Sequence, residues 1–224
     1  MPTIEEARKW YPYDDPVHGF AHILRVLAMA ERLAIAEGAD LEIVRTAALL
    51  HDAQPVAFTT DNQQSTVSNQ QSEITRSYHH LTSAELAGEV LQAEGWEASR
   101  IEAVQHCVRA HRFRDGREPP QTLEARVLFD ADKLDAIGAI GVARAIAYAA
   151  EAGQPAYALP SQRFLETGQT EPGEPNSAYH EFVFKLNKLK DRLYTPAARQ
   201  IGEERHRYLE DFFNQLALEI TGER

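Results

Sequence analysis

The sequence has a single cysteine, Cys107, among its 224 residues, which excludes an intramolecular disulfide. Disulfides form in oxidising compartments, so we expect this chain in a reducing cytoplasm. We interpret Cys107 as a small buried apolar residue, because structural cysteines are usually buried and unreactive. The N-terminal segment MPTIEEARKWYPYDD has early acidic residues and no apolar run, so we do not expect it to be a signal peptide.

Long apolar runs and basic clusters are also missing. No stretch of about 20 apolar residues occurs, so we expect no transmembrane span and no membrane partner. The formal net charge is −11, and without clustered Lys and Arg we expect no duplex nucleic acid as partner. An acidic protein can still bind a small anion where a metal ion supplies the positive charge.

Apolar residues recur at helical spacing along the chain, and no segment alternates cleanly as a strand would. We predict an all-α fold in one domain over residues 1–224, with a core at about 18–150 and C-terminal helices at about 178–220 packed on it. Asp40 can cap a central helix, and the capping boxes at Thr82 and Ser99 open two more. The predicted helices cover residues 3–11, 20–37, about 41–52, 84–93, about 100–111, 122–150, 178–193 and 196–220.

Two segments are predicted to be long loops. Residues 54–77 are rich in Gln, Ser, Thr and Asn, and we interpret them as a lid over the site or as a plain solvated insertion. Residues 153–177 are rich in Gly and Pro and form a second loop with a role in substrate selection. Gly138 and Gly141 weaken the helix predicted at 122–150, which makes sense if a backbone or a substrate approaches closely there.

Histidines and aspartates gather in three of the predicted helices. His22 lies early in one apolar helix, His51 and Asp52 close the next, and Asp132 lies on a later one. Imidazole and carboxylate ligands together suit a divalent cation, which can turn water into a nucleophile. The alternative is that His51-Asp52 is merely a helix terminus and His22 a core histidine.

Four sequence blocks carry a family resemblance, in the order HGFAHILRVLAMA, AALLHDA, DADKLDAIGAIGVAR and FVFKLNKLKDRLYTPAARQIGEERHRYLEDF. With the order His22, His51-Asp52, Asp132, the chain resembles the HD-domain metal-dependent phosphohydrolases. More narrowly, it resembles a bacterial subgroup that includes nucleotide pyrophosphohydrolases. The resemblance implies one divalent ion held by these four residues, with Mn²⁺ as first choice and Mg²⁺, Ni²⁺, Co²⁺, Fe²⁺ or Zn²⁺ as alternatives.

The same resemblance implies roles for two further histidines. His80 and His111 fall where HD relatives with two metals have a second pair, so they would bind a second ion or hydrogen-bond a substrate phosphate. The second role suits a one-metal subgroup better. The alternative is that they are polar surface histidines without function, and it applies more strongly to His79 and His106.

One departure from the family concerns the catalytic base. Many HD enzymes have an acid just after the His-Asp pair, whereas this sequence reads HDAQP. Asp135 is our candidate for the base, or for an acceptor behind a ligand, because it shares a helical face with Asp132. The alternative is a surface carboxylate that stabilises the helix.

Four cations are candidates for contact with a substrate phosphate, each with the alternative of a solvated or ion-paired charge. They are Arg25, Lys133, Arg112 and Lys185.

The predicted function is therefore hydrolysis of a phosphorylated small molecule, a nucleotide by resemblance, with release of pyrophosphate from a nucleoside triphosphate. A phosphomonoesterase or phosphodiesterase is the alternative within the same chemistry. Outside it, a nucleotide-sensing module with little turnover and a di-iron oxygenase are the other hypotheses. We expect a monomer or a homodimer.

Overall fold

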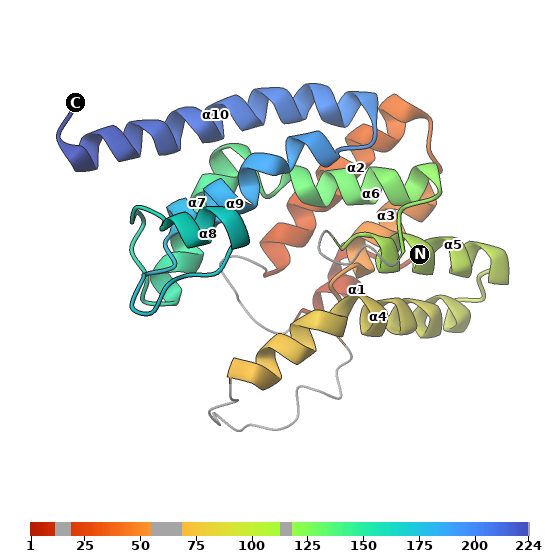
Figure 1. Ribbon diagram of the computed structural model, residues 1–224. Coiled ribbons are helices and arrows are strands. Elements are labelled where there is room, and N and C mark those ends of the chain that lie inside the picture. Colours follow the sequence, from red (N-terminus) through yellow and green to blue (C-terminus); the bar gives the residue numbers. More distant parts are fainter. Residues whose placement is uncertain (12–18, 55–68, 113–117, 224) are drawn as a thin grey trace. The chain divides into compact units, whose positions relative to one another are not determined.

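The computed structural model describes residues 1–11, 19–54, 69–112 and 118–223 (Figure 1). These residues form helices and no strands, so the predicted all-α fold is confirmed. None of the described helices is both long and apolar enough to cross a membrane. The chain divides into two compact units, Met1–Asp132 and Lys133–Arg224. The single domain over 1–224 stays a prediction.

The first unit is built around a buried helix. α3 (Leu41–Leu50) contacts α1 (Ile4–Arg8), α2 (Phe20–Glu37), α4 (Asn69–Ala93) and α5 (Ala98–Ala110). Apolar residues lie on nearly all sides of α3, as expected for a helix surrounded by others. The prediction that this helix is central and buried is confirmed. α6 (Leu123–Leu134) begins in the first unit, and its last two residues belong to the second.

The boundary between α2 and α3 follows from two local signals. Gly38 adopts a φ of +77° and ends α2, as glycine commonly does after a helix. Asp40 caps α3, because its carboxylate accepts hydrogen bonds from the backbone N–H groups of Glu42 at 3.0 Å and Ile43 at 3.1 Å. The predicted limits of α2 and the predicted cap of α3 are confirmed. α3 ends at Leu50, so His51 and Asp52, which were predicted at the C-terminal end of this helix, lie in the turn that follows it.

Three predictions in the first unit are wrong. α4 already begins at Asn69, so residues 69–77 are not a loop, and residues 55–68 of the predicted lid lie outside the described residues. Gln and Glu are good helix formers, so a polar composition does not exclude a helix. Thr82 is therefore inside α4 and caps nothing, and its hydroxyl donates to the carbonyl of His79 at 3.2 Å. Ser99 is not a cap either, because α5 begins at Ala98.

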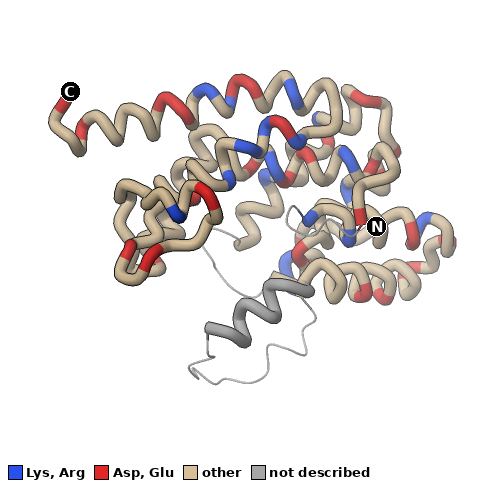
Figure 2. The backbone as a smooth tube through the Cα atoms, in the orientation of Figure 1, with Lys and Arg blue, Asp and Glu red and all other residues tan. Residues whose placement is uncertain are grey.

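The second unit contains α7 (Gly138–Glu151), α8 (Gln162–Thr167), α9 (Ala178–Phe184), the 3₁₀ helices η2 (Leu186–Lys188) and η3 (Lys190–Arg192), and α10 (Pro196–Thr221). α10, drawn blue in Figure 1, packs on α7 and η3. Its Phe213 stacks on Phe182 with ring centroids 4.6 Å apart, and both rings are buried. Along α10, Lys and Arg are interspersed with Asp and Glu (Figure 2).

The single helix predicted at 122–150 is wrong, because residues 135–137 separate α6 from α7. Gly138 adopts a φ of +73°, which side-chain-bearing residues rarely adopt. A Cβ on Gly141 would lie 2.3 Å from the carbonyl oxygen of Ala136. The close approach of a backbone, one of the two reasons expected for these glycines, is therefore present.

The other predicted limits in this unit also change. The helix predicted at 178–193 ends at Phe184 and continues as the two 3₁₀ helices, while α8 interrupts the loop predicted at 153–177. The longest described helix is α10, with 26 residues.

A carboxylate holds the segment between α7 and α9 in place. Glu174 accepts hydrogen bonds from the backbone N–H groups of Glu171 and Ser161, both at 2.6 Å, and from Nε2 of His180 at 3.1 Å. Burial alone would raise the pKa of Glu174, but these hydrogen bonds and one from the Ser161 hydroxyl lower it to about 2. The carboxylate therefore stays charged and tethers the segment to α9.

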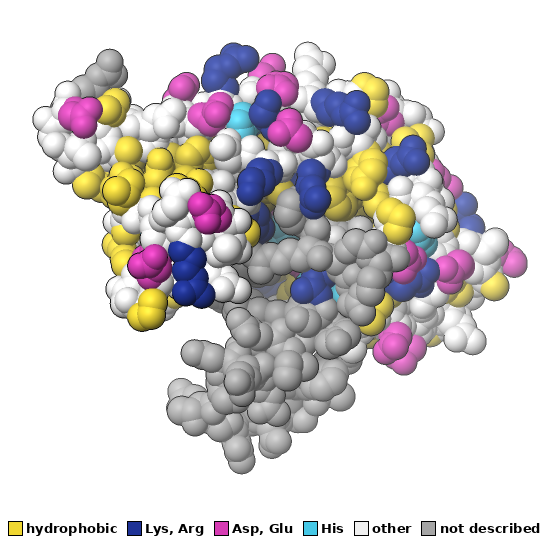
Figure 3. All heavy atoms as spheres, viewed as in Figure 1, with side chains coloured by type: hydrophobic (Ala, Val, Ile, Leu, Met, Phe, Trp, Pro, Cys, Tyr) yellow, Lys and Arg dark blue, Asp and Glu magenta, His cyan; other side chains and the backbone are white. Residues whose placement is uncertain are grey.

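Some large hydrophobic side chains of the second unit are exposed, and hydrophobic side chains are visible on the face in Figure 3. They are Ile140, Tyr148, Leu159, Leu165, Phe184, Tyr194, Tyr208 and Ile220. Exposed apolar groups of this kind are compatible with association. The monomer or homodimer stays a prediction.

Candidate metal centre

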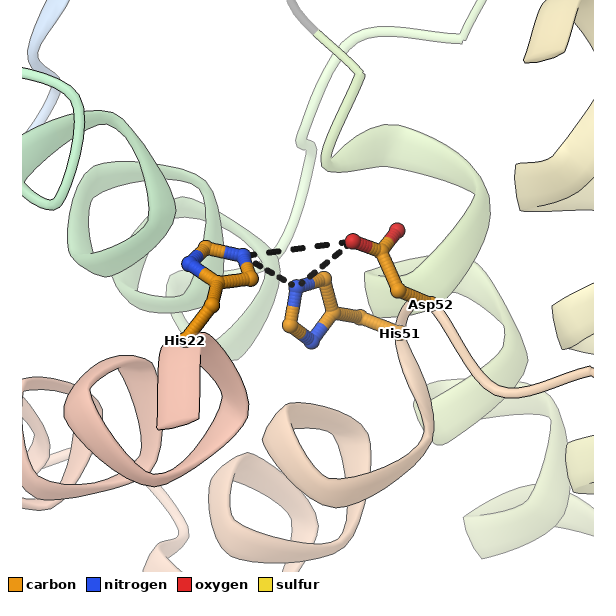
Figure 4. A group of neighbouring side chains, drawn as sticks. All are labelled: His22, His51 and Asp52. Carbon is orange, nitrogen blue, oxygen red and sulfur yellow. Dashed lines mark hydrogen bonds and ion pairs between the residues drawn. The ribbon is translucent and has the colours of Figure 1, made fainter. Parts of the chain in front are cut away.

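The four residues predicted as metal ligands lie in one cluster of the first unit. Nε2 of His22, on α2, is 3.4 Å from Nε2 of His51 and 3.9 Å from Oδ2 of Asp52 (Figure 4). It also lies 3.5 Å from Oδ1 of Asp132, on α6. The two histidines are buried, whereas Asp52 and Asp132 are partly exposed. The cluster therefore joins three helices and faces solvent through its carboxylates.

The hydrogen bonds of His51 fix its tautomer. Nδ1 lies 2.9 Å from the carbonyl oxygen of Ala48, which can only accept, so Nδ1 carries the proton. Burial is the main reason that the pKa of His51 falls to about 4, since it outweighs the opposing effect of Asp52, and nearby His111 acts in the same direction as burial. The ring is therefore neutral near pH 7, and its Nε2 directs a lone pair at His22 and at Oδ2 of Asp52, 3.5 Å away.

The two oxygens of Asp52 face different partners. Oδ2 is directed toward His22 and His51, while Oδ1 lies 3.1 Å from Nε2 of His79 and 3.4 Å from Nε2 of His111. Burial would raise the pKa of Asp52, but the charges and hydrogen bonds of His51, His111 and His79 hold it well below its usual range. Asp52 is therefore a carboxylate shared by two groups of candidate ligands.

Sequence reasoning missed His79 and selected its neighbour. The sequence gives His79 no role in the site, whereas the structure brings it to Asp52 beside His111, with the ring centroids of the two histidines 5.5 Å apart. His80 is buried next to His79, but among the described residues it belongs to neither ligand group. The orientation of α4 decides which of the two adjacent histidines faces the cluster. The predicted helix begins only at residue 84, so it includes neither histidine and gives no orientation for them.

His111, predicted as a partner in the site, has the same arrangement as His51. It is the C-cap of α5, and its Nδ1 hydrogen-bonds to the carbonyl of Val108. Its Nε2 faces Asp52 and lies 3.4 Å from Oδ1 of this carboxylate. The alternative that His111 lies on the surface is wrong, because the residue is buried.

Asp135 is not on a common helical face with Asp132, because α6 ends at Leu134. It belongs to the second unit, where it is buried and receives a hydrogen bond to Oδ2 from Nη1 of Arg144 at 2.7 Å. The alternative of a surface carboxylate is therefore wrong. Its role as base or acceptor stays a prediction.

The predicted phosphate-binding cations are divided between the units. Arg25, three residues after His22, and Arg112, next to His111, are half-buried residues of the first unit. Lys133 is buried in the second unit, and Nζ of Lys185 is 2.5 Å from a carboxylate oxygen of Glu181. The ion-paired alternative fits the surroundings of Lys185. A role in phosphate binding stays a prediction for all four residues.

The chemistry of the donor set fits a divalent cation. The lone pair of His51 and the carboxylate of Asp52 repel each other, and no proton on Nε2 of His51 is available to separate them. A positive ion between these atoms would remove the repulsion, and mixed nitrogen and oxygen ligands suit ions such as Mn²⁺. His51 is also the C-cap of α3, and the C-terminus of a helix favours positive charge.

Comparison with known proteins identifies relatives of the chain. The model of the HD domain family matches residues 19–137, which include all four clustered residues. Protein YpgQ of Bacillus subtilis strain 168 is 34% identical over 229 residues, which cover 99% of this chain and 96% of YpgQ.

Solved structures show the same similarity. The crystal structure of YpgQ in complex with ADP has a TM-score of 0.68 and 30% identity, and covers 98% of this chain and 99% of YpgQ. An HD-superfamily hydrolase of Bacillus thuringiensis has a TM-score of 0.62 and 30% identity, over 91% of this chain and 87% of that chain.

Proposed function

The chain belongs to the HD domain family, and on this premise we propose that it is a metal-dependent phosphohydrolase that acts on nucleotides. The observation that carries the proposal is the convergence of His22, His51, Asp52 and Asp132 from three helices. The similarity to an HD-superfamily hydrolase supports hydrolysis as the type of reaction.

His22 and His51 would hold the ion through Nε2, and Asp52 and Asp132 through their carboxylates. A divalent ion bound there supplies positive charge for phosphate oxygens and lowers the pKa of water. Mn²⁺ is our first choice, because it accepts imidazole together with carboxylate, whereas Mg²⁺ prefers oxygen ligands. Ni²⁺, Co²⁺, Fe²⁺ and Zn²⁺ also accept this donor set.

His79 and His111 would contact the substrate phosphate from the other side of Asp52. Their Nε2 atoms lie within 3.4 Å of Oδ1 of this carboxylate, so a phosphate near the ion would come within reach of both rings. We also propose Asp135, whose Oδ2 accepts a hydrogen bond from Nη1 of Arg144 at 2.7 Å, as the base or as an acceptor behind a ligand. The role of His80, as a ligand of a second ion or as a donor to a substrate phosphate, stays a prediction.

A nucleotide is the proposed substrate because YpgQ was crystallised with ADP, which has two linked phosphates. For a nucleoside triphosphate, water would add to the α-phosphorus, and the bond between this phosphorus and the bridging oxygen would break. The products are a nucleoside monophosphate and pyrophosphate, and the proton of the water passes to a base or to solvent. The chain would discriminate substrates by their phosphates, and we propose no preference for one base.

The test is turnover of a panel of nucleoside triphosphates by the full chain, stripped of metal and refilled with Mn²⁺, with pyrophosphate and orthophosphate resolved. Asp132→Ala should abolish the release of pyrophosphate. Asp191→Ala is the matched control, because Asp191 is an exposed aspartate of η3 and its loss should leave turnover unchanged.

Other results of this assay would favour one of the alternative functions. Orthophosphate as the only phosphate product would favour a phosphomonoesterase, and hydrolysis of phosphodiesters alone would favour a phosphodiesterase. Nucleotide binding without turnover in the presence of any of these metals would favour a nucleotide-sensing module over an enzyme. Two iron ions per chain with redox activity would favour the di-iron oxygenase.

A further inference from the structure

The turn that carries His51 and Asp52 is held by groups that are not ligands. The last carbonyls of a helix have no partner within it, and those of α3 lie just before the cluster. His51 donates through Nδ1 to the carbonyl of Ala48, and the backbone N–H of Ala53 donates to that of Leu50 at 3.2 Å. Between them, the carbonyl of Leu49 accepts from the hydroxyl of Tyr11 at 2.8 Å.

Tyr11 reaches this carbonyl from the segment that follows α1. The backbone beside it is also attached to the turn, because the N–H of Gln54 donates to the carbonyl of Trp10 at 3.1 Å. The ring of Tyr11 lies against Phe20, with centroids 5.5 Å apart. The segment therefore contacts the turn on both sides of His51 and Asp52 in sequence.

Ser83 holds the turn from α4. Its hydroxyl is buried and donates to the carbonyl of Ala53 at 2.8 Å. Ser83 and His79 are four residues apart, so they share a face of α4. On this face His79 contacts Oδ1 of Asp52, and Ser83 contacts Ala53, the residue after Asp52. The hydrogen bond from Ser83 therefore fixes the turn and also the position of His79 relative to Asp52.

We propose that Tyr11 and Ser83 are positioning residues, which set the orientation of His51 and Asp52 for an ion without touching it. The inference rests on the proposed metal-dependent function and adds two residues to that site. Groups that orient metal ligands contribute to affinity because they hold the donor atoms in place before the ion arrives. Tyr11 and Ser83 bind backbone carbonyls on either side of the two ligands, so they fix the turn that carries both.

The experiment measures Mn²⁺ binding by the full chain, with free Mn²⁺ quantified by electron paramagnetic resonance. Tyr11→Phe removes only an oxygen, and Ser83→Ala leaves at most a void of that size. Each variant should raise the Mn²⁺ dissociation constant about tenfold, the lower end of the range for groups that support metal ligands. The visible absorption of Co²⁺-loaded protein should also change, since it reports ligand geometry.

The control is Thr46→Val, which deletes another buried hydroxyl of the first unit. Thr46 is fully buried in α3, and its Oγ1 makes no hydrogen bond within the described residues. Its loss should leave the Mn²⁺ affinity and the Co²⁺ spectrum unchanged. The melting temperature of each metal-free variant shows whether a change in affinity reflects a general loss of stability.

Unchanged Mn²⁺ affinity in folded Tyr11→Phe and Ser83→Ala would overturn the inference, even if both melt at lower temperature. Should Ser83→Ala not fold, Tyr11→Phe alone decides in the same way. Turnover of nucleotides is measured separately. Weaker Mn²⁺ binding in the variants of a protein that hydrolyses no nucleotide would leave this inference standing and remove the proposed function.

Discussion

Replacing Gly141 by alanine should destabilise the protein, although alanine is the better helix former. Gly141 lies in α7, one turn after the break that separates this helix from α6. An added Cβ would lie 2.3 Å from the carbonyl oxygen of Ala136 and 2.6 Å from its carbon. These atoms belong to the backbone, so relief requires a shift of the chain rather than a change of rotamer.

Two effects of opposite sign determine the magnitude. Helix propensity favours alanine over glycine by about 1 kcal/mol in a helix interior. Adding a methyl group where there is no space costs about 1–3 kcal/mol of stability. We take the upper value of about 3 kcal/mol for Gly141, because the atom that the methyl group would meet belongs to the backbone. The net loss is then about 2 kcal/mol, which lowers the melting temperature by about 4–8 °C in a chain of this size.

The assay is thermal unfolding followed by circular dichroism, with Ala143→Gly as the control in the same helix. Ala143 is exposed, so the reverse exchange should cost only the propensity difference of about 1 kcal/mol. If propensity alone governed α7, the two substitutions would change the melting temperature in opposite directions. A higher melting temperature for Gly141→Ala would refute the close backbone approach that we read from the structure.

Three further predictions concern other parts of the fold. The pKa of Glu174 is lowered from 4.5 to about 2, so the stability it contributes is present above about pH 4.5 and is lost as pH falls toward about 2. Glu174→Gln should therefore lower the denaturant midpoint at about pH 7 and much less at about pH 3, and an equal deficit at both would contradict this. Asp40→Ala removes the cap of α3 and should cost about 1 kcal/mol in denaturant unfolding, whereas no loss would show that the cap contributes nothing. Burial raises the pKa of Cys107, so its thiol should react with Ellman's reagent only in denaturant, and rapid labelling of the folded chain would contradict its burial.

The helices of the first unit could be predicted where residue chemistry marks their ends. Gly38 and Asp40 act locally, so the limits of α2 and the start of α3 can be predicted from the sequence. α4 shows the opposite case. Its N-terminal part is polar, and an apolar stripe was the signal that the prediction required, although helices need none in order to form.

The break between α6 and α7 could not be predicted from periodicity. Apolar residues continue at helical spacing across residues 135–137, because α6 before the turn and α7 after it each have a buried apolar face. Gly138 and Gly141 were noted as weak points within one helix. Their sequence does not reveal that one adopts a positive φ and that the other faces a carbonyl, since both facts depend on the path of the chain.

Only part of the candidate site could be predicted from the sequence. His22, His51, Asp52 and Asp132 could be identified because their residue types and their order carry the signal. Groups that act through the backbone leave no such signal: the hydroxyl of Tyr11 and that of Ser83 meet carbonyls, and every residue has a carbonyl.

The adjacency of His51 and Asp52 shows why these supporting groups matter. Neighbouring residues of a continuous helix point about 100° apart, so both can face one ion only where the helix ends. In the structure α3 ends at Leu50, and the turn that follows brings Nε2 of His51 within 3.5 Å of Oδ2 of Asp52. A turn has fewer internal hydrogen bonds than a helix, and its conformation therefore depends on the partners of its carbonyls. The geometry of the two central ligands is in this sense set by Tyr11 and Ser83, which the ion would not touch.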